Sequence, residues 1–254
     1  MWPMSPWKKR LRACAIHFIL SLIVATLAAL LVFGVWYPYP YRELSGGREL
    51  FTLVVLVDVL LGPLITFVIF NATKTRRHLA MDFAVVGLLQ ITALTYGLWT
   101  VFMARPVHLV FEYSRMAVVH AVDVDPETLL KAPSELVKLP LSGPTLLSLR
   151  PLRGAEAIDS VLQATAGIAQ AAQPALWQPY ENAREQILAE SVPIAQLKAR
   201  FGNRLNDIDE AVARSGRPES TLRSLPLLSR QKAWTVLIDS QTAIPLGFFA
   251  LDSF

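Results

Sequence analysis

The feature that most constrains this chain is an apolar stretch, Leu50 to Phe70, which is long enough to cross a lipid bilayer. It carries one acid, Asp58, near its middle and a Gly62-Pro63 pair about one turn later. Because the core of a bilayer offers no hydrogen-bond partner to an exposed backbone, such a stretch must fold as a helix. The sequence therefore predicts a spanning helix that holds a carboxylate at depth and is kinked by a proline.

Two further apolar stretches flank this span. Ala13 to Trp36 has no formal charge and follows a basic tail, and Ala80 to Met103 carries Asp82 at its start and Gln90 near its middle. The first stretch could be interpreted as a signal peptide, but it is much longer than the usual apolar region of about 7–15 residues, so a retained helix is favoured. We expect a tail at residues 1–12 and a transmembrane region at residues 13–103, with spans at 13–36, 50–70 and 80–103.

The cations predict the orientation of these spans. The tail holds Lys8, Lys9, Arg10 and Arg12 without an acid, and the loop between the second and third spans holds Lys74, Arg76 and Arg77. In the loop between the first two spans, by contrast, two arginines are offset by two glutamates. The positive-inside rule places the tail and the basic loop in the cytoplasm. Residues 104–254 then form an extracytoplasmic domain.

Composition excludes several classes of function. The chain is 53% hydrophobic and its net charge is +4, but the first 106 residues hold 10 Lys/Arg against 4 Asp/Glu, so the excess lies at the membrane flanks. A nucleic-acid surface is therefore not indicated. The single cysteine, Cys14, allows no intrachain disulfide, and the four histidines show no metal-ligand spacing. We expect no metal and no cofactor.

The C-terminal part reads as a small α+β domain. Two β-rich runs, residues 107–112 and 117–122, predict one hairpin, and residues 234–252 predict a second. Residues 154–173, 181–190 and 193–215 read as helices, the last ended by Gly216. The simplest architecture is an antiparallel sheet of these hairpins with the helices on one face.

Asp58 is the candidate site residue that most needs an explanation. A carboxylate at bilayer depth costs at least about 2.5–3.5 kcal/mol, so it should face the bundle and find a partner. Gln90 differs from it in depth by only about 6 Å on the helical rise. Three roles are open for Asp58, Gly62, Pro63 and Gln90: a lock between the second and third spans, a docking point for the helix of a partner, and proton or ion chemistry.

The sequence does not indicate catalysis. It lacks the metalloprotease, nucleophile-elbow and phosphate-loop motifs, and an intramembrane aspartyl mechanism would need a second carboxylate at the depth of Asp58. We expect no enzyme and no catalytic residue. A sensor of an extracytoplasmic ligand stays open as the alternative function, although the short cytoplasmic segments would oblige it to signal through a membrane partner.

The order of these features resembles the type IV pilin accessory proteins of the TfpX/TfpZ type. The matching residues are spread over nearly the whole chain: Asp58, Gly62-Pro63-Leu64, Lys74, Asp82, Gln90, Tyr96-Gly97, Ala104-Arg105-Pro106, Val107 to Val119, Ser142-Gly143-Pro144, Pro179-Tyr180, Leu225-Pro226-Leu227 and Trp234 to Asp252. No single one is a strong motif, and the collinear set carries the resemblance. One departure is Ser114-Arg115-Met116, where an acidic-Arg-aromatic triplet is expected.

The resemblance implies an inner-membrane accessory factor that modulates the assembly or display of a type IV pilin. The implied partners are the pilin, other pilus assembly proteins and the lipid bilayer. It implies no catalytic residue and no nucleic-acid partner.

Overall fold

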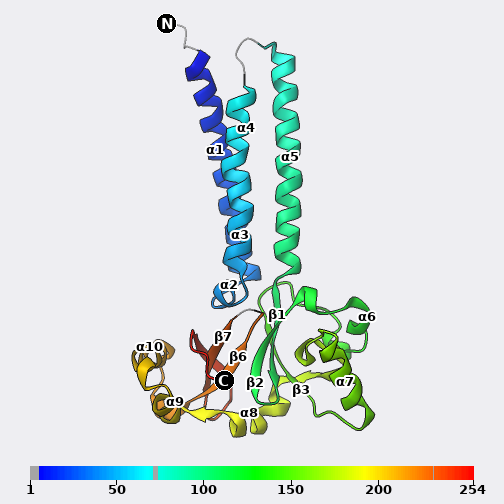
Figure 1. Cartoon of the computed structure of the whole chain (residues 1–254), viewed down its shortest axis with the longest axis vertical. Coiled ribbons are helices and arrows are strands. Elements are labelled where there is room, and N and C mark those ends of the chain that lie inside the picture. Colours follow the sequence, from blue (N-terminus) through cyan, green and yellow to red (C-terminus); the bar gives the residue numbers. More distant parts are fainter. Residues whose placement is uncertain (1–5, 71–73, 231) are drawn as a thin grey trace. The chain divides into compact units, whose positions relative to one another are not determined.

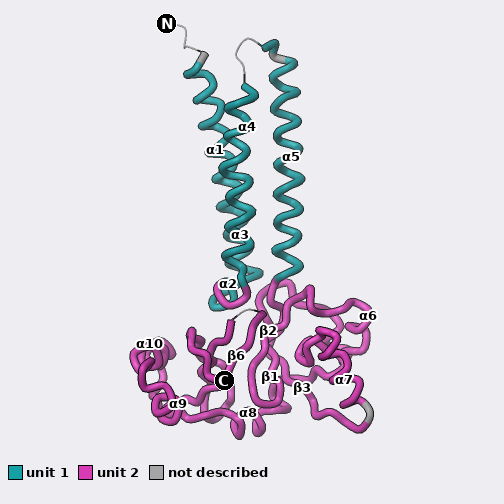
Figure 2. The backbone as a smooth tube through the Cα atoms, in the orientation of Figure 1, with its two compact units in different colours: residues 1–42, 46–104 teal, residues 43–45, 105–254 magenta. Residues whose placement is uncertain are grey.

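The computed structural model describes residues 6–70, 74–230 and 232–254. Positions 1–5 of the expected tail, and positions 71–73 of the expected basic loop, lie outside the described residues. The chain divides into two compact units, which Figure 2 shows in two colours. The first unit comprises residues 1–42 and 46–104, and the second comprises residues 43–45 and 105–254.

The first unit contains three helices that are long and apolar enough to cross a membrane, at Trp7–Trp36, Gly47–Ile69 and Arg77–Met103. The first consists of α1 (Pro6–Leu31) and a π-helical turn, η1 (Val32–Trp36). The second consists of α3 (Gly47–Leu56), the π-helical turn η2 (Val57–Leu61) and α4 (Gly62–Ile69), and the third is α5 (Arg76–Met103). A short helix, α2 (Tyr41–Leu44), precedes the second span. The three-helix transmembrane bundle is as expected (Figure 1).

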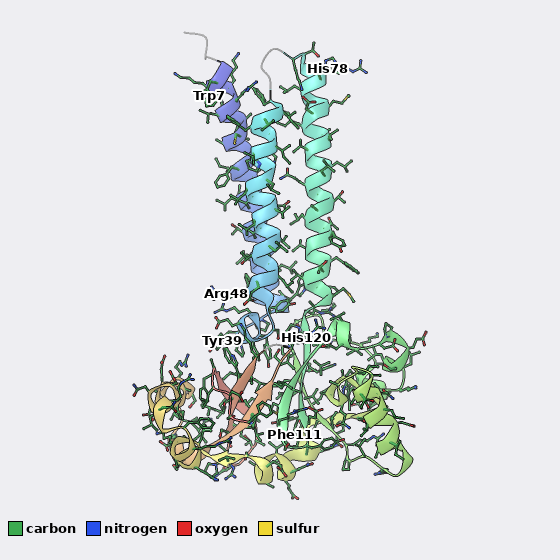
Figure 3. The ribbon with its side chains drawn as sticks, viewed as in Figure 1. Trp7, Tyr39, Arg48, His78, Phe111 and His120 are labelled. Carbon is green, nitrogen blue, oxygen red and sulfur yellow. The ribbon has the colours of Figure 1, made fainter. Side chains whose placement is uncertain are left out.

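Consecutive spans run in opposite directions. Trp7 at the start of α1 and His78 at the start of α5 lie at one end of the unit, and Tyr39 and Arg48 lie at the other (Figure 3). The end that holds Tyr39 is closed by Tyr37, whose ring is fully buried and whose hydroxyl donates to the carbonyl oxygen of Val101 at 3.0 Å. Gly47 permits this arrangement, because a Cβ there would lie 2.5 Å from the Tyr37 ring.

The second unit is built on an eight-stranded mixed sheet in the order β4-β3-β1-β2-β6-β7-β8, with β5 paired to β6. Its strands are β1 (Pro106–Glu112), β2 (Arg115–His120), β3 (Thr145–Leu149), β4 (Trp177–Pro179), β5 (Val192–Pro193), β6 (Leu222–Leu228), β7 (Ala233–Asp239) and β8 (Pro245–Phe249). The β1–β2 and β7–β8 pairs are antiparallel, whereas β1 pairs β3 and β2 pairs β6 in parallel.

Helical segments cover this sheet through two hydrophobic clusters. One cluster packs β1, β2 and β3 against Ala171, Ala172 and Trp177, and the other packs β6, β7 and β8 against α9 and α10. The helices and helical turns of this unit are η3 (Ala121–Asp123), α6 (Pro126–Leu129), η4 (Ser134–Leu136), α7 (Ala155–Thr165), η5 (Gln170–Ala172), η6 (Pro174–Leu176), η7 (Tyr180–Ala183), α8 (Arg184–Glu190), α9 (Ile194–Arg200), η8 (Gly202–Arg204), α10 (Leu205–Ser215) and η9 (Glu219–Thr221).

The α+β class is confirmed, and the sheet is larger and more mixed than the two expected hairpins. Both hairpins form, but β6 joins them by pairing with β2 on one side and β7 on the other. Patterning missed β6 because Pro226 interrupts a short leucine-rich run. The expected helix at 193–215 is divided into α9 and α10 around Gly202, and Gly216 ends it in the left-handed conformation at φ 66°.

Candidate intramembrane polar site

The backbone around Asp58 departs from α-helical spacing because of the proline that follows. Residues Val57–Leu61 form a π turn, in which each carbonyl is bonded by the N–H five residues ahead. At that spacing the carbonyl of Asp58 would face the nitrogen of Pro63, which carries no hydrogen. The turn therefore leaves the Asp58 carbonyl available to a donor from another helix.

Gln90 of α5 supplies that donor and is itself held by His17 of α1. Nε2 of Gln90 donates to the Asp58 carbonyl oxygen at 3.2 Å, and Oε1 of Gln90 lies 2.6 Å from Nε2 of His17. Nδ1 of His17 lies 2.5 Å from Oγ1 of Thr66 in α4. An amide oxygen only accepts, so His17 donates to Gln90 through Nε2, and its Nδ1 contacts the Thr66 hydroxyl. One imidazole thus joins all three spans.

Two glycines bring the facing helices close enough for this arrangement. A Cβ at Gly62 would overlap the amide nitrogen of Gln90, and one at Gly97 would lie 2.8 Å from Cγ2 of Val54. Gly87, three residues before Gln90 on α5, has open space around it. At Gly62 and Gly97, therefore, a side chain would prevent α5 from packing closely against the second span. Small residues serve the same purpose in other contacts between membrane helices.

The carboxyl group of Asp58 lies against this network without joining it. Its side chain is 8% exposed, and Oδ1 is buried with no hydrogen-bond partner in the described part of the chain. Asp58 lines two apolar hollows of about 290 and 140 Å³ that lie between the second and third spans. The structure thus places an unsatisfied carboxylate oxygen beside an apolar hollow.

The expected contact between Asp58 and Gln90 is made by the backbone carbonyl of Asp58, not by its carboxyl group. The central role of His17 was missed, because a lone histidine in an apolar span gives no sign of which residues it will meet. Thr66 was missed for the same reason. Cys14 also contacts the kink, since its Sγ lies 3.4 Å from the Pro63 carbonyl oxygen. Asp82, near the start of α5, pairs with Lys74 at 2.5 Å.

The second unit holds a separate hollow of about 460 Å³ beside β2 and η5. Two ion pairs lie on its lining, one from Arg115 to Glu112 at 2.8 Å and one from Arg230 to Asp123. Burial opposes ionisation of Asp123, but hydrogen bonds from His120 and Arg230 lower its pKa to about 2. Among residues 6–70, 74–230 and 232–254, no group of three His, Cys, Asp or Glu side chains is arranged to hold a metal ion.

His108, also in the second unit, is a buried base with one unused nitrogen. Its Nδ1 lies 2.7 Å from Oγ1 of Thr145, and its ring meets the Trp177 ring edge-on at 4.6 Å. Nε2 is buried and has no hydrogen-bond partner within the described residues. Burial lowers the pKa of His108 to about 4, so the imidazole is neutral near pH 7 and acts as a packed core residue.

The fold and the site together define a class: a three-span membrane protein whose polar network joins the helices and whose α+β domain follows the last span. Residues 5–46 match the family model described as fimbrial assembly protein FimB. The chain is 35% identical over 243 residues to the fimbrial assembly protein of serogroup I from Dichelobacter nodosus, covering 93% of this chain and 95% of that one. It is 33% identical, with the same coverage, to the serogroup E1 protein of that organism.

This chain therefore belongs to the fimbrial assembly protein family. A shorter relative, for serogroups C1 and C2 of the same organism, is 41% identical over 109 residues, 43% of this chain and 83% of that relative. No solved structure matches the chain.

Proposed function

We propose that this protein is an inner-membrane accessory factor of the TfpX/TfpZ type, which modulates the assembly or display of a type IV pilin by binding it and which catalyses no reaction. The observation that carries the proposal is the similarity to fimbrial assembly proteins, because it spans 93% of the chain and so includes both the helices and the sheet. Other pilus assembly proteins are further candidate partners.

The charges at the two ends of the first unit support the orientation that this function needs. The end marked by Trp7 and His78 also carries Lys8, Lys9, Arg10, Arg12, Lys74 and Arg77 (Figure 3). At the opposite end, Arg42 and Arg48 are accompanied by Glu43 and Glu49. The positive-inside rule assigns the first end to the cytoplasm and residues 104–254 to the periplasm.

A protein of this design offers two kinds of surface to a pilin. A pilin subunit that waits in the membrane is held by one apolar helix and carries its globular head outside. The three spans offer an apolar, kinked surface to such a helix, and the outer domain offers sheet edges to the head. Such a factor would act by holding the subunit rather than by chemistry.

A deletion strain tests this function. Loss of the gene should reduce surface fimbriae while the pilin is still made, and the wild-type gene should restore them. The protein should also co-purify with the pilin after crosslinking in membranes. Normal fimbriation in the deletion strain, or recovery with other membrane proteins and never with pilin, would overturn the proposal. Complementation with relatives from other strains would then show whether each one serves a particular pilin.

The hollow of about 460 Å³ beside β2 favours one alternative, a sensor of an extracytoplasmic ligand that acts through a membrane partner. The charged residues that line it form two ion pairs, Arg115–Glu112 and Arg230–Asp123. A ligand would have to displace one of these pairs. A sensor would leave fimbriation intact in the deletion strain and abolish a response to a periplasmic ligand instead.

A further inference from the structure

We propose that a furrow between the second and third spans binds one transmembrane helix of a fimbrial subunit, and that this helix donates a hydrogen bond from a neutral side chain to the carboxyl group of Asp58. This inference rests on the proposed function and names the surface and the chemistry by which it works. The furrow consists of the two hollows that share Val57, Asp58 and Ala93.

The lining residues of the furrow follow helical spacing on both walls. One wall comes from the second span and the other from α5, and on each wall a set of positions recurs every three or four residues: Leu50, Leu53, Val57, Leu61 and Ile65, and Val86, Leu89, Ala93, Tyr96 and Thr100. Residues at this spacing lie on one face of a helix. Leu50 to Ile65 extends about 22 Å along the axis at the helical rise, a large part of a bilayer core about 30 Å thick. A furrow of this length suits a helix better than a small ligand.

The walls of the furrow are exposed and its floor is polar. Leu53, Leu89 and Tyr96 are 64%, 64% and 68% exposed, whereas Asp58 on the floor is 8% exposed. Apolar side chains with this exposure face lipid or another helix. The buried Oδ1 of Asp58, which has no partner within the described residues, distinguishes this face from an ordinary lipid-facing surface. An unsatisfied carboxyl oxygen in hydrocarbon is costly, so the furrow favours an occupant that brings a donor.

The donor is assigned to a neutral hydroxyl or amide, because a second charge at this depth would add its own cost of transfer into the bilayer. It is assigned to another protein because no side chain of the described residues bonds Oδ1 of Asp58, and Thr100, the threonine that lines the furrow, uses its hydroxyl within its own helix. Thr26, Thr92 and Thr100 each donate to the carbonyl oxygen four residues back in their own helix. A fimbrial subunit, held in the membrane by one apolar helix, meets this description.

Site-specific photo-crosslinking in membranes of the fimbriated strain tests this assignment. A photoreactive phenylalanine analogue at Leu53 or Ala93, inside the furrow, should crosslink to the fimbrial subunit. The same analogue at Leu88, which is 67% exposed but lines neither hollow, is the matched control and should not. Crosslinks to lipid alone, to a second copy of this chain or to an unrelated membrane protein would overturn the proposal.

Substitutions then test the carboxyl group and the shape of the furrow. Asp58→Leu should lower the crosslink yield about threefold to tenfold, the range of a hydrogen bond between membrane helices. Asp58→Asn keeps an acceptor oxygen and should restore at least half of the yield, and its failure to do so would exclude a neutral donor. Leu89→Trp should obstruct the furrow, whereas Leu88→Trp at the same depth should not. If an Asp58 variant does not accumulate in the membrane, the comparison of Leu89→Trp with Leu88→Trp still decides the test.

The two proposals fail in different ways. If deletion of the gene leaves fimbriation normal, the proposed function is wrong. If deletion abolishes fimbriation but Asp58→Leu and Leu89→Trp both support it at normal protein level, without change in crosslinking, the function stands and the furrow is wrong.

Discussion

At the scale of residues, the membrane site depends on a glycine as much as on its polar groups. Gln90 can bond the Asp58 carbonyl only because Gly62 leaves room for its amide. The other partner of that amide, His17, donates to Oε1 of Gln90 and contacts the Thr66 hydroxyl, so the side chains of His17, Gln90 and Thr66 all have partners. Oδ1 of Asp58 is the contrasting case, buried and unmatched within the described residues. The backbone carbonyl of Asp58 thus bonds a neighbouring helix of the bundle, whereas its carboxyl group faces the furrow.

Gly62→Ala should weaken the bundle. The new methyl group would push the Gln90 amide off the Asp58 carbonyl and loosen the His17 contact, at a cost of about 1 kcal/mol. Thermal unfolding of the full-length protein in detergent micelles measures this cost. Gly87→Ala is the matched control, because its Cβ meets open space and alanine favours helix. Equal melting temperatures for the two variants would refute the role assigned to Gly62.

Acid should destabilise the outer domain through His108. Its pKa is about 4 in the folded state against about 6.5 when unfolded, so protonation favours unfolding. Stability is full above about pH 6.5 and falls by about 3 kcal/mol as the pH drops to 4. The Asp123 carboxylate, with its pKa near 2, stabilises the folded state above about pH 3.8, and this contribution is lost only as the pH falls from about 3.8 toward 2, below the range of the His108 effect. Pulse proteolysis in urea across this range measures the loss.

The matched controls for this prediction are two glutamine substitutions. His108→Gln should flatten the pH dependence between 4 and 6.5, and His78→Gln, at an exposed position, should leave it unchanged. A steep dependence that survives in His108→Gln would assign the acid sensitivity to another group.

At the scale of elements, the backbone of the second span depends on the N–H that Pro63 lacks. The π turn at Val57–Leu61 ends where Pro63 fails to supply an N–H, and the helix continues as α4 beyond it. The Asp58 carbonyl, which this leaves without a donor in its own helix, accepts a hydrogen bond from Gln90. The π turn is therefore part of the contact with α5, and Asp58, which lies within it, also lines the furrow.

Pro63→Ala should make this contact partly redundant. Residue 63 would regain an N–H that competes with Gln90 for the Asp58 carbonyl, so Gln90→Leu should cost less in the Pro63→Ala background than in the wild type. A double-mutant cycle on unfolding in micelles should show coupling of about 0.5 kcal/mol or more. Strict additivity of the two substitutions would mean that the proline does not create the acceptor.

At the scale of the whole molecule, the distribution of charge decides what each part can meet. Cations gather at one end of the bundle, while residues 107–254 hold 14 Lys/Arg against 16 Asp/Glu and carry little net charge. This asymmetry is the basis for the proposed orientation. In the proposed orientation the sheet domain would lie outside, where the heads of fimbrial subunits would be.

A C-terminal fusion to alkaline phosphatase should be active in whole cells, and a C-terminal fusion to green fluorescent protein exported through the same route should be dark. Reporter fusions after residue 74 should give the opposite result. Neutralising Lys8, Lys9, Arg10 and Arg12 together should produce a mixed orientation, since these cations dominate the bias of the first span. An unchanged, single orientation in that variant would show that other signals set the topology.

The three spans, the α+β class of the sheet domain and its two hairpins could all be predicted from the sequence. These follow from local properties: the length and polarity of apolar runs, the alternation of side chains along strands, and the turn residues between them. The pairing of β6 with the hairpins, the bond from Gln90 to the backbone of Asp58 and the contacts of His17 with the other spans became apparent only in the folded structure. His17 and Gln90 are 73 positions apart, and Met116 and Leu227, which pair between β2 and β6, are farther apart still. Local patterns carry no information about which distant groups will meet.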